Sequence, residues 1–172
     1  LQMRKGVLEF IDLATKMPDI QFVWAGNFAF KGISEGRKEI MEHMDDLPDN
    51  VHFLGLVERD RMNEFFNMGD VMLQLSFEEL FPMTILESMN ANIPLLLRDL
   101  PEYKPILFDY YLKANSQQTF KDELTKLKED ADYYAKACEG SKRGEQFYSK
   151  ESILEQWQQF YDKVATERNL LS

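Results

Sequence analysis

The chain has 172 residues, of which 44% are hydrophobic and 29% charged, a composition typical of a globular domain with its own core. The net charge of −10 argues against nucleic acid as a partner, because phosphate backbones are bound by clustered Lys and Arg. No run of about 18 apolar residues predicts a membrane-spanning helix. The single Cys138 cannot form an internal disulfide, which favours a reducing, cytoplasmic compartment.

Apolar periodicity predicts an alternation of helices and strands along the first two thirds of the chain. A helix is expected over 4–17 and a strand over 20–25. The elements expected next are a helix at 38–44, a strand at 51–56, a helix at 58–68, a strand at 70–76, a helix at 83–92 and a strand at 93–97. Such alternation indicates an α/β fold, with a parallel sheet, right-handed crossovers and helices on both faces.

The last third of the chain is expected to be mostly helical. A short strand over 110–114 precedes helices at 117–140, at about 141–148 and from 150 to about 168, with Gly140 ending the first of them. The last helix is expected to turn an apolar face inward, made of Ile153, Leu154, Trp157, Phe160, Tyr161 and Val164. Residues 1–172 are therefore predicted to form one domain.

The most informative stretch runs from Asp70 to Leu97 and contains a strand, an acidic loop, a helix and a second strand. A helix that begins at Met83 offers unpaired N–H groups and the positive end of its dipole, where a phosphate binds well. Glu79 lies in the loop and Glu87 lies beyond the first turn of the helix, seven residues further on. A carboxylate beside a bound phosphate often holds sugar hydroxyls.

The motif of two glutamates separated by seven residues, Glu79 and Glu87, resembles a signature of the glycosyl transferases group 1 family. Members of this family are retaining enzymes with two Rossmann-like domains (GT-B). The sequence Ser-Met-Asn-Ala-Asn-Ile-Pro-Leu that follows Glu87 is similar to that family's continuation of the motif. Three further elements occur in the family's order. They are Arg4-Lys5-Gly6-Val7, Phe22-Val23-Trp24-Ala25-Gly26 and Val51-His52-Phe53-Leu54-Gly55-Leu56-Val57.

The resemblance implies that this chain is the nucleotide-sugar-binding half of a GT-B enzyme, with UDP-glucose as the expected donor and no bound metal or cofactor. Lys5 would offset the charge of the diphosphate, Glu79 would face the transferred sugar, and Glu87 would hold the ribose. The other expected donor-binding residues are Arg4, Gly26, Val57, Leu80, Phe81, Pro82, Met83 and Thr84. The plain alternatives are a solvated lysine, a surface glutamate at 87 and an ordinary strand end at Val57.

The resemblance also implies a missing first strand, with Leu1-Gln2-Met3 as its remnant, and an absent N-terminal acceptor domain. The Pro-Met-Thr sequence at 82–84 is similar to enzymes that glucosylate membrane diacylglycerol, and so is the segment 98–103. A peripheral contact with the inner face of the membrane would then come through the absent domain. This chain alone is expected to bind nucleotide weakly. The alternatives are a non-catalytic nucleotide-binding module and a nucleotide-sugar epimerase.

Overall fold

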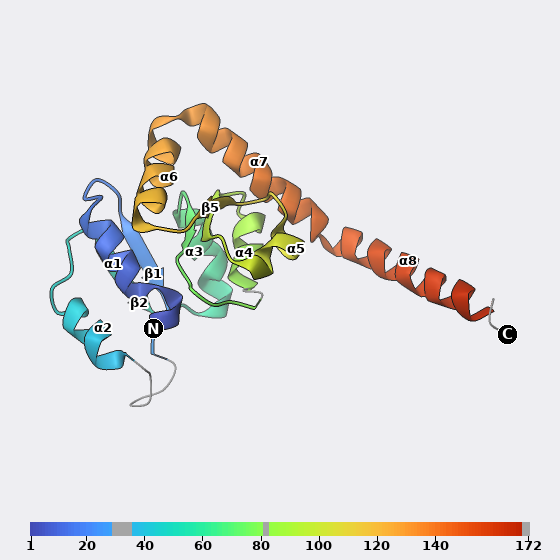
Figure 1. Ribbon diagram of the computed structural model, residues 1–172, viewed down its shortest axis with the longest axis horizontal. Coiled ribbons are helices and arrows are strands. Elements are labelled where there is room, and N and C mark those ends of the chain that lie inside the picture. Colours follow the sequence, from blue (N-terminus) through green and yellow to red (C-terminus); the bar gives the residue numbers. More distant parts are fainter. Residues whose placement is uncertain (29–35, 81–82, 170–172) are drawn as a thin grey trace.

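The computed structural model describes residues 1–28, 36–80 and 83–169 and has parallel strands flanked by helices (Figure 1). Strands β1 (Phe22–Ala25) and β2 (Val51–Gly55) form one parallel sheet. Strands β3 (Met72–Gln74), β4 (Leu95–Arg98) and β5 (Leu112–Ala114) form a second parallel sheet in that order. The α-helices are α1 (Val7–Thr15), α2 (Arg37–Met44), α3 (Met62–Met68), α4 (Met83–Asn90), α5 (Lys104–Leu107), α6 (Gln117–Glu129), α7 (Ala131–Phe147) and α8 (Lys150–Asn169). Short 3-10 helices are η1 (Met3–Lys5), η2 (Arg59–Arg61) and η3 (Pro101–Tyr103).

Helices cover both faces of the three-stranded sheet, as β4 demonstrates. Leu96 points into a core shared with α1 and α6, whereas its neighbours Leu95 and Leu97 point into a core shared with α4 and α5. Successive side chains of a strand alternate between faces, so a strand apolar at every position must be buried on both. The predicted α/β fold, with parallel strands and helices on both faces, is confirmed.

The two sheets are separate in the described part of the chain, because β1 pairs with β2 and β3 pairs with β4 but β1 and β3 do not pair. Residues of β1 and β3 nevertheless line the same cavity, so the two strands face each other across it. The first strand that the family resemblance expects before this chain stays a prediction.

The predicted helix over 4–17 is wrong at its start. The chain forms η1, then Gly6 with φ of 73°, and only then α1. A left-handed backbone interrupts a right-handed helix, and glycine is the residue that adopts it without steric cost. This break gives Lys5 a direction that a continuous helix would not provide.

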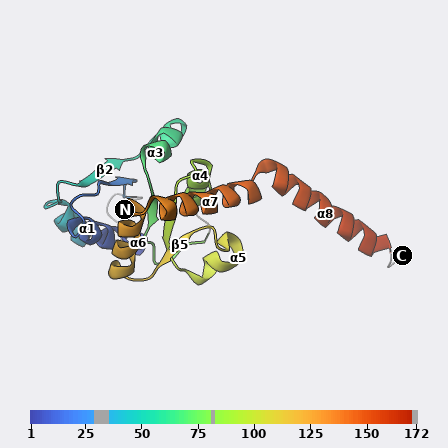
Figure 2. The ribbon, with the colours of Figure 1, turned by 90° about the horizontal axis from the view of Figure 1, so that it is seen from above.

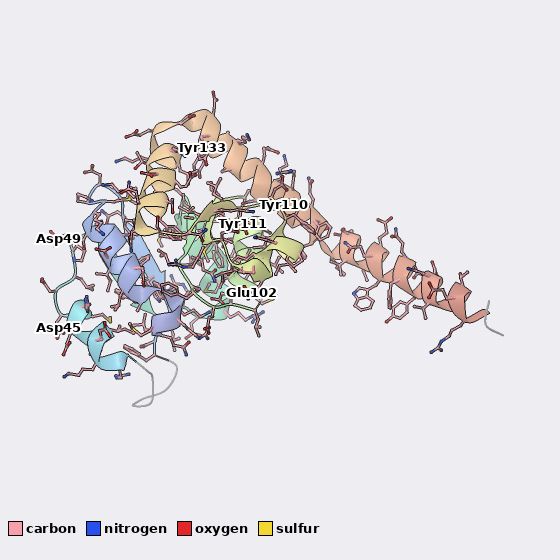
Figure 3. All side chains as sticks on the ribbon, viewed as in Figure 1. Asp45, Asp49, Glu102, Tyr110, Tyr111 and Tyr133 are labelled. Carbon is pink, nitrogen blue, oxygen red and sulfur yellow. The ribbon has the colours of Figure 1, made fainter. Side chains whose placement is uncertain are left out.

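The predicted break at Gly140 is also wrong. The helix ends instead at Asp130, whose side chain accepts a hydrogen bond from the Tyr133 backbone N–H (2.9 Å) and so begins α7. Gly140 lies inside α7, where an added Cβ would be 3.1 Å from the carbonyl oxygen of Tyr110, a residue labelled in Figure 3. Gly144 likewise faces the Met89 side chain of α4. These glycines permit close packing and do not end the helix.

The apolar face of α8 does not pack inward, contrary to the sequence prediction. Figures 1 and 2 show α8 extending away from the sheets, and its Trp157 and Phe160 side chains are 53% and 54% exposed. Trp157 stacks on Tyr161 of the same helix. The sequence pattern correctly identified an amphipathic helix, but the described residues contain no surface that covers it. No helix within the described ranges has both the length and the apolar character needed to cross a membrane.

The Asn50 side chain joins the end of α1 to the start of β1. It is 5% exposed, and its Nδ2 lies within 2.8–3.0 Å of the carbonyl oxygens of Ala14, Met17 and Ile20. We expect Asn50→Ala to lower the free energy of unfolding by about 2 kcal/mol, because buried carbonyls lose their donor. In a chain of this size the midpoint of thermal unfolding should fall by roughly 4–8 °C.

Asn67→Ala is the matched control for this prediction. Asn67 donates only to exposed oxygens of Asn63 within α3, the backbone carbonyl (2.7 Å) and Oδ1 (3.1 Å), so its loss should change the free energy of unfolding by less than about 0.5 kcal/mol. Equal melting temperatures for the two variants would show that Asn50 does not hold α1 against β1.

Candidate functional site

A cavity of about 410 Å³ lies between β1 and β3. Its apolar walls come from these two strands and from α3. Its polar lining residues are Gln2, Lys5, Asn27, Gln74, Ser76, Glu79 and Thr84. Apolar walls with a few polar groups are typical of a small-molecule site.

The turn at Gly6 places Lys5 at this cavity. A Cβ on Gly6 would be 2.6 Å from the carbonyl oxygen of Leu75, which follows β3, so only glycine permits this approach. The backbone N–H of Phe77 donates to the Arg4 carbonyl oxygen (2.8 Å) and fixes the turn against the same segment. The start of the chain is thereby held beside the end of β3.

Lys5 Nζ forms an ion pair with Oε1 of Glu79. The Glu79 side chain is only 6% exposed and that of Lys5 33% exposed. A second donor, Nε2 of Gln74, lies 2.9 Å from the same carboxylate oxygen. Because a buried carboxylate is costly without such partners, these two contacts explain how Glu79 can occupy the cavity.

Thr84 brings the start of α4 to the same cavity. It is the second residue of this helix and lines the cavity, while its carbonyl oxygen accepts a hydrogen bond from the Ser88 hydroxyl (2.6 Å). The first turn of a helix has unpaired backbone N–H groups and a positive partial charge. Lys5 and this helix terminus are therefore two sources of positive potential at one cavity.

The structure thus brings together four of the residues predicted from the sequence, which are Lys5, Gly26, Glu79 and Thr84. Arg4 lies next to them, where its Nη1 donates to the Glu78 carbonyl oxygen (3.3 Å). Arg4 itself is not among the residues that line the cavity.

The remaining predicted residues lie outside the cavity lining. Leu80 and Met83 have exposed side chains, at 89% and 59%. Glu87 is half-buried on α4, and Val57 follows β2. Phe81 and Pro82 lie outside the described residues.

Two residues of the site were not predicted. Gln74 is 9% exposed and contacts Glu79, and a glutamine between Leu73 and Leu75 in a buried strand was the signal for it. Tyr103 is 1% exposed and its hydroxyl lies 3.4 Å from Gln74 Nε2. Burial raises the pKa of Tyr103, and the nearby Glu79 charge raises it further, so this hydroxyl stays neutral.

The comparison with known protein families identifies the chain. Residues 1–144 match the family described as "Glycosyl transferases group 1". The chain belongs to this family. The resemblance drawn from Lys5, Glu79 and Glu87 is therefore confirmed at the level of the family. In the part of the chain that the structure describes, no group of three or more His, Cys, Asp or Glu side chains could hold a metal ion.

Two curated relatives are glycolipid enzymes by name. The chain is 37% identical over 165 residues to "Alpha-galactosylglucosyldiacylglycerol synthase" of Streptococcus pneumoniae. The aligned region covers 96% of this chain and 44% of that protein. It is 29% identical to "Processive diacylglycerol alpha-glucosyltransferase" of Acholeplasma laidlawii over 72% of this chain and 37% of that protein. The chain spans less than half the length of either relative.

Two solved structures share the fold. Anabaena HepE in complex with UDP-glucose matches 96% of this chain and 46% of its own, with a TM-score of 0.77 and 18% identity. The C-terminal domain of the Francisella tularensis group 1 protein LpcC matches 89% of this chain and 83% of its own, with a TM-score of 0.69 and 20% identity. The second comparison shows that one domain of such a protein has this architecture.

The position of Lys5 should depend on the close approach at Gly6. We expect Gly6→Ala to lower the free energy of unfolding by at least about 2 kcal/mol, because alanine is strained at positive φ and its Cβ would overlap the Leu75 backbone. Thermal unfolding measures this loss.

Gly69→Ala is the matched control, since Gly69 has a φ of −91° and nearly 4 Å of space around its Cβ position (3.9 Å to Phe66 O). It should leave the melting temperature almost unchanged. A Gly6→Ala variant as stable as the control would contradict the close approach.

Proposed function

We propose that this chain is the donor-binding half of a glycosyltransferase that transfers a hexose from a UDP-sugar to a membrane glycerolipid. The observation that carries the proposal is the Lys5–Glu79 ion pair in a cavity that the start of α4 also reaches. An ammonium and a helix terminus are suited to a diphosphate, and a carboxylate is suited to sugar hydroxyls.

The proposed chemistry is electrostatic. Negative charge develops on the diphosphate as the bond between sugar and phosphate breaks, and Lys5 with the N–H groups of α4 would stabilise it. When the diphosphate binds, it would take over the Lys5 ammonium, and Glu79 would then face the sugar with Gln74 as its remaining partner. Glu87, further along α4, would accept hydrogen bonds from the ribose hydroxyls.

UDP-glucose is the proposed donor. HepE, which has the same fold, was crystallised with UDP-glucose. The names of both curated relatives concern diacylglycerol glycolipids, which supports a glycerolipid acceptor. The finding that this chain spans 44% and 37% of those relatives supports a larger enzyme with a second, acceptor-binding domain.

Two features of the chain also support a second domain and an additional strand. The aromatic face of α8 is exposed and would be covered by the acceptor domain. β1 and β3 face each other without pairing and would accept a parallel strand between them. Such a strand would fill the apolar part of the cavity between β1 and β3, and the donor would bind at the polar residues Lys5, Glu79 and Thr84. We propose that a segment preceding Leu1 supplies the acceptor domain and the additional strand. We also propose that the whole enzyme acts at the cytoplasmic face of the membrane.

Binding and transfer assays test the proposed function. UDP-, GDP- and ADP-sugars are compared by thermal shift, and transfer is then measured from the best donor to diacylglycerol and glucosyl-diacylglycerol in mixed micelles. The proposal predicts stabilisation by a UDP-sugar and a glycolipid product. Binding without transfer by the whole enzyme would favour a nucleotide-binding module, and interconversion of UDP-sugars without an acceptor would favour an epimerase.

Lys5 should be required for diphosphate binding. We expect Lys5→Met to weaken UDP binding by about 10- to 100-fold, because a charge-assisted hydrogen bond is lost, and Lys5→Arg to retain most of the affinity. Isothermal titration calorimetry measures both. Lys16→Met, which removes an exposed lysine paired with Asp12, is the control. An equal affinity in Lys5→Met and Lys16→Met would exclude Lys5 as a phosphate ligand.

The covering of α8 can be measured through Trp157. In a Trp24→Phe background Trp157 is the sole tryptophan, and it is 53% exposed here. We expect its fluorescence emission to shift to shorter wavelength in the two-domain enzyme relative to this chain, because an apolar surface would exclude water from the indole. Identical spectra would show that the second domain does not cover this face.

A further inference from the structure

We propose that Gln74 positions Glu79 through its amide nitrogen and binds a hydroxyl group of the transferred sugar through its amide oxygen. The inference rests on the proposed function, since it names a further contact of the same donor site. It starts from an exception in the sequence. Gln74 is the last residue of β3, between two leucines, and it is 9% exposed.

The nitrogen end of the side chain has a defined set of partners. Nε2 lies 2.9 Å from Glu79 Oε1, 3.4 Å from the Tyr103 hydroxyl and 3.5 Å from the Ser76 hydroxyl. The first of these contacts is the strongest, because its acceptor is charged. Gln74 therefore holds the carboxylate from within the sheet, whereas Lys5 holds it from the start of the chain.

Both contacts with the carboxylate fall on the same atom. Lys5 and Gln74 each contact Oε1 of Glu79, so neither occupies Oε2. When a diphosphate takes over the Lys5 ammonium, the hydrogen bond from Gln74 is what keeps the carboxylate in place. A neutral amide suits this role because no anionic ligand group competes for it as strongly as for an ammonium.

The orientation of the amide is fixed by charge. Turning it over would place the amide oxygen against the Glu79 carboxylate, and two acceptors repel. The oxygen Oε1 is thus directed away from Glu79. It is buried and has no hydrogen-bond partner among the described residues, although Gln74 lines the cavity.

A buried amide oxygen needs a donor. The donor that this cavity would receive is a hydroxyl group, since a sugar carries several and Glu79 beside Gln74 accepts from them as well. The amide oxygen and the carboxylate would each accept from a different hydroxyl of one sugar ring. A backbone N–H from a strand inserted between β1 and β3 is the competing donor, and the experiment separates the two.

The test compares two ligands, UDP-glucose and UDP, in the two-domain enzyme and its Gln74→Met variant. Methionine has a similar length and no hydrogen-bonding amide. We expect UDP-glucose affinity to fall by about tenfold or more, while UDP affinity changes by less than about twofold, because the groups that are lost contact the sugar and Glu79 and not the diphosphate. The donor KM should rise and kcat should fall.

Gln117→Met is the matched control. Gln117 on α6 also has a buried Oε1 with no partner among the described residues, but it does not line this cavity, and its Nε2 donates to the Glu9 carbonyl oxygen (2.8 Å). The same chemical change at Gln117 should leave both affinities and kcat unchanged.

Gln74→Glu separates the two roles of the side chain. This variant retains an acceptor oxygen but replaces the N–H donor of the amide with a second carboxylate beside Glu79. Its kcat should therefore be lower than that of Gln74→Met. An equal or smaller loss would show that Nε2 does not position Glu79.

Other outcomes would overturn the inference in different ways. Wild-type affinities in Gln74→Met would exclude a sugar contact while leaving the proposed function intact. An equal loss of affinity for UDP and UDP-glucose, together with a lower melting temperature, would show that a donor of the protein itself pairs with Oε1 of Gln74. A wild-type enzyme that binds UDP but not UDP-glucose would overturn the inference and the choice of UDP-glucose as donor, and one that binds no UDP-sugar and no UDP would overturn the whole proposed function.

Discussion

The buried carboxylate of Glu79 is the constraint on which the rest of the site depends. Its side chain is 6% exposed, so it needs donors close by, and it receives them from Lys5 and Gln74. Lys5 is 74 positions away in sequence and reaches the pair because Gly6 allows its turn to touch the backbone of Leu75. A single glycine thereby joins the start of the chain to the end of β3.

This arrangement has a consequence for ligand binding. The Lys5 ammonium is already paired with Glu79, so a diphosphate that binds there must replace one anion by another. Exchange of partners costs less than creating a new buried charge, because the ammonium stays paired throughout. Glu79, once released by Lys5, is free to accept from a sugar while Gln74 holds it in place.

Much of the fold could be predicted from the sequence, because its dominant signals are local. The alternation of strands and helices indicated a parallel sheet with helices on both faces, and the surroundings of β4 bear this out. The roles of Gly6 and Gly140 could not be predicted, because each depends on a distant backbone carbonyl, that of Leu75 or of Tyr110. The prediction that the Trp157 face of α8 packs inward was wrong, because periodicity identifies an apolar face but not the surface that covers it.

The candidate site shows the same division. Lys5 and Glu79 could be identified individually from motifs, but their direct pairing depends on tertiary structure. Gln74 could have been noticed as a polar residue in an apolar strand, yet its partners, Glu79 and Tyr103, become visible only when β3 and η3 are folded together.

The affinity of the Glu79→Gln variant for UDP tests the central claim most directly. Glutamine keeps the length of the side chain and can still accept from Gln74, but it no longer competes as an anion for the Lys5 ammonium. If the ammonium serves both the carboxylate and the diphosphate, calorimetry will find that UDP binds more tightly to Glu79→Gln than to the wild type. Weaker binding of UDP by this variant would contradict the account.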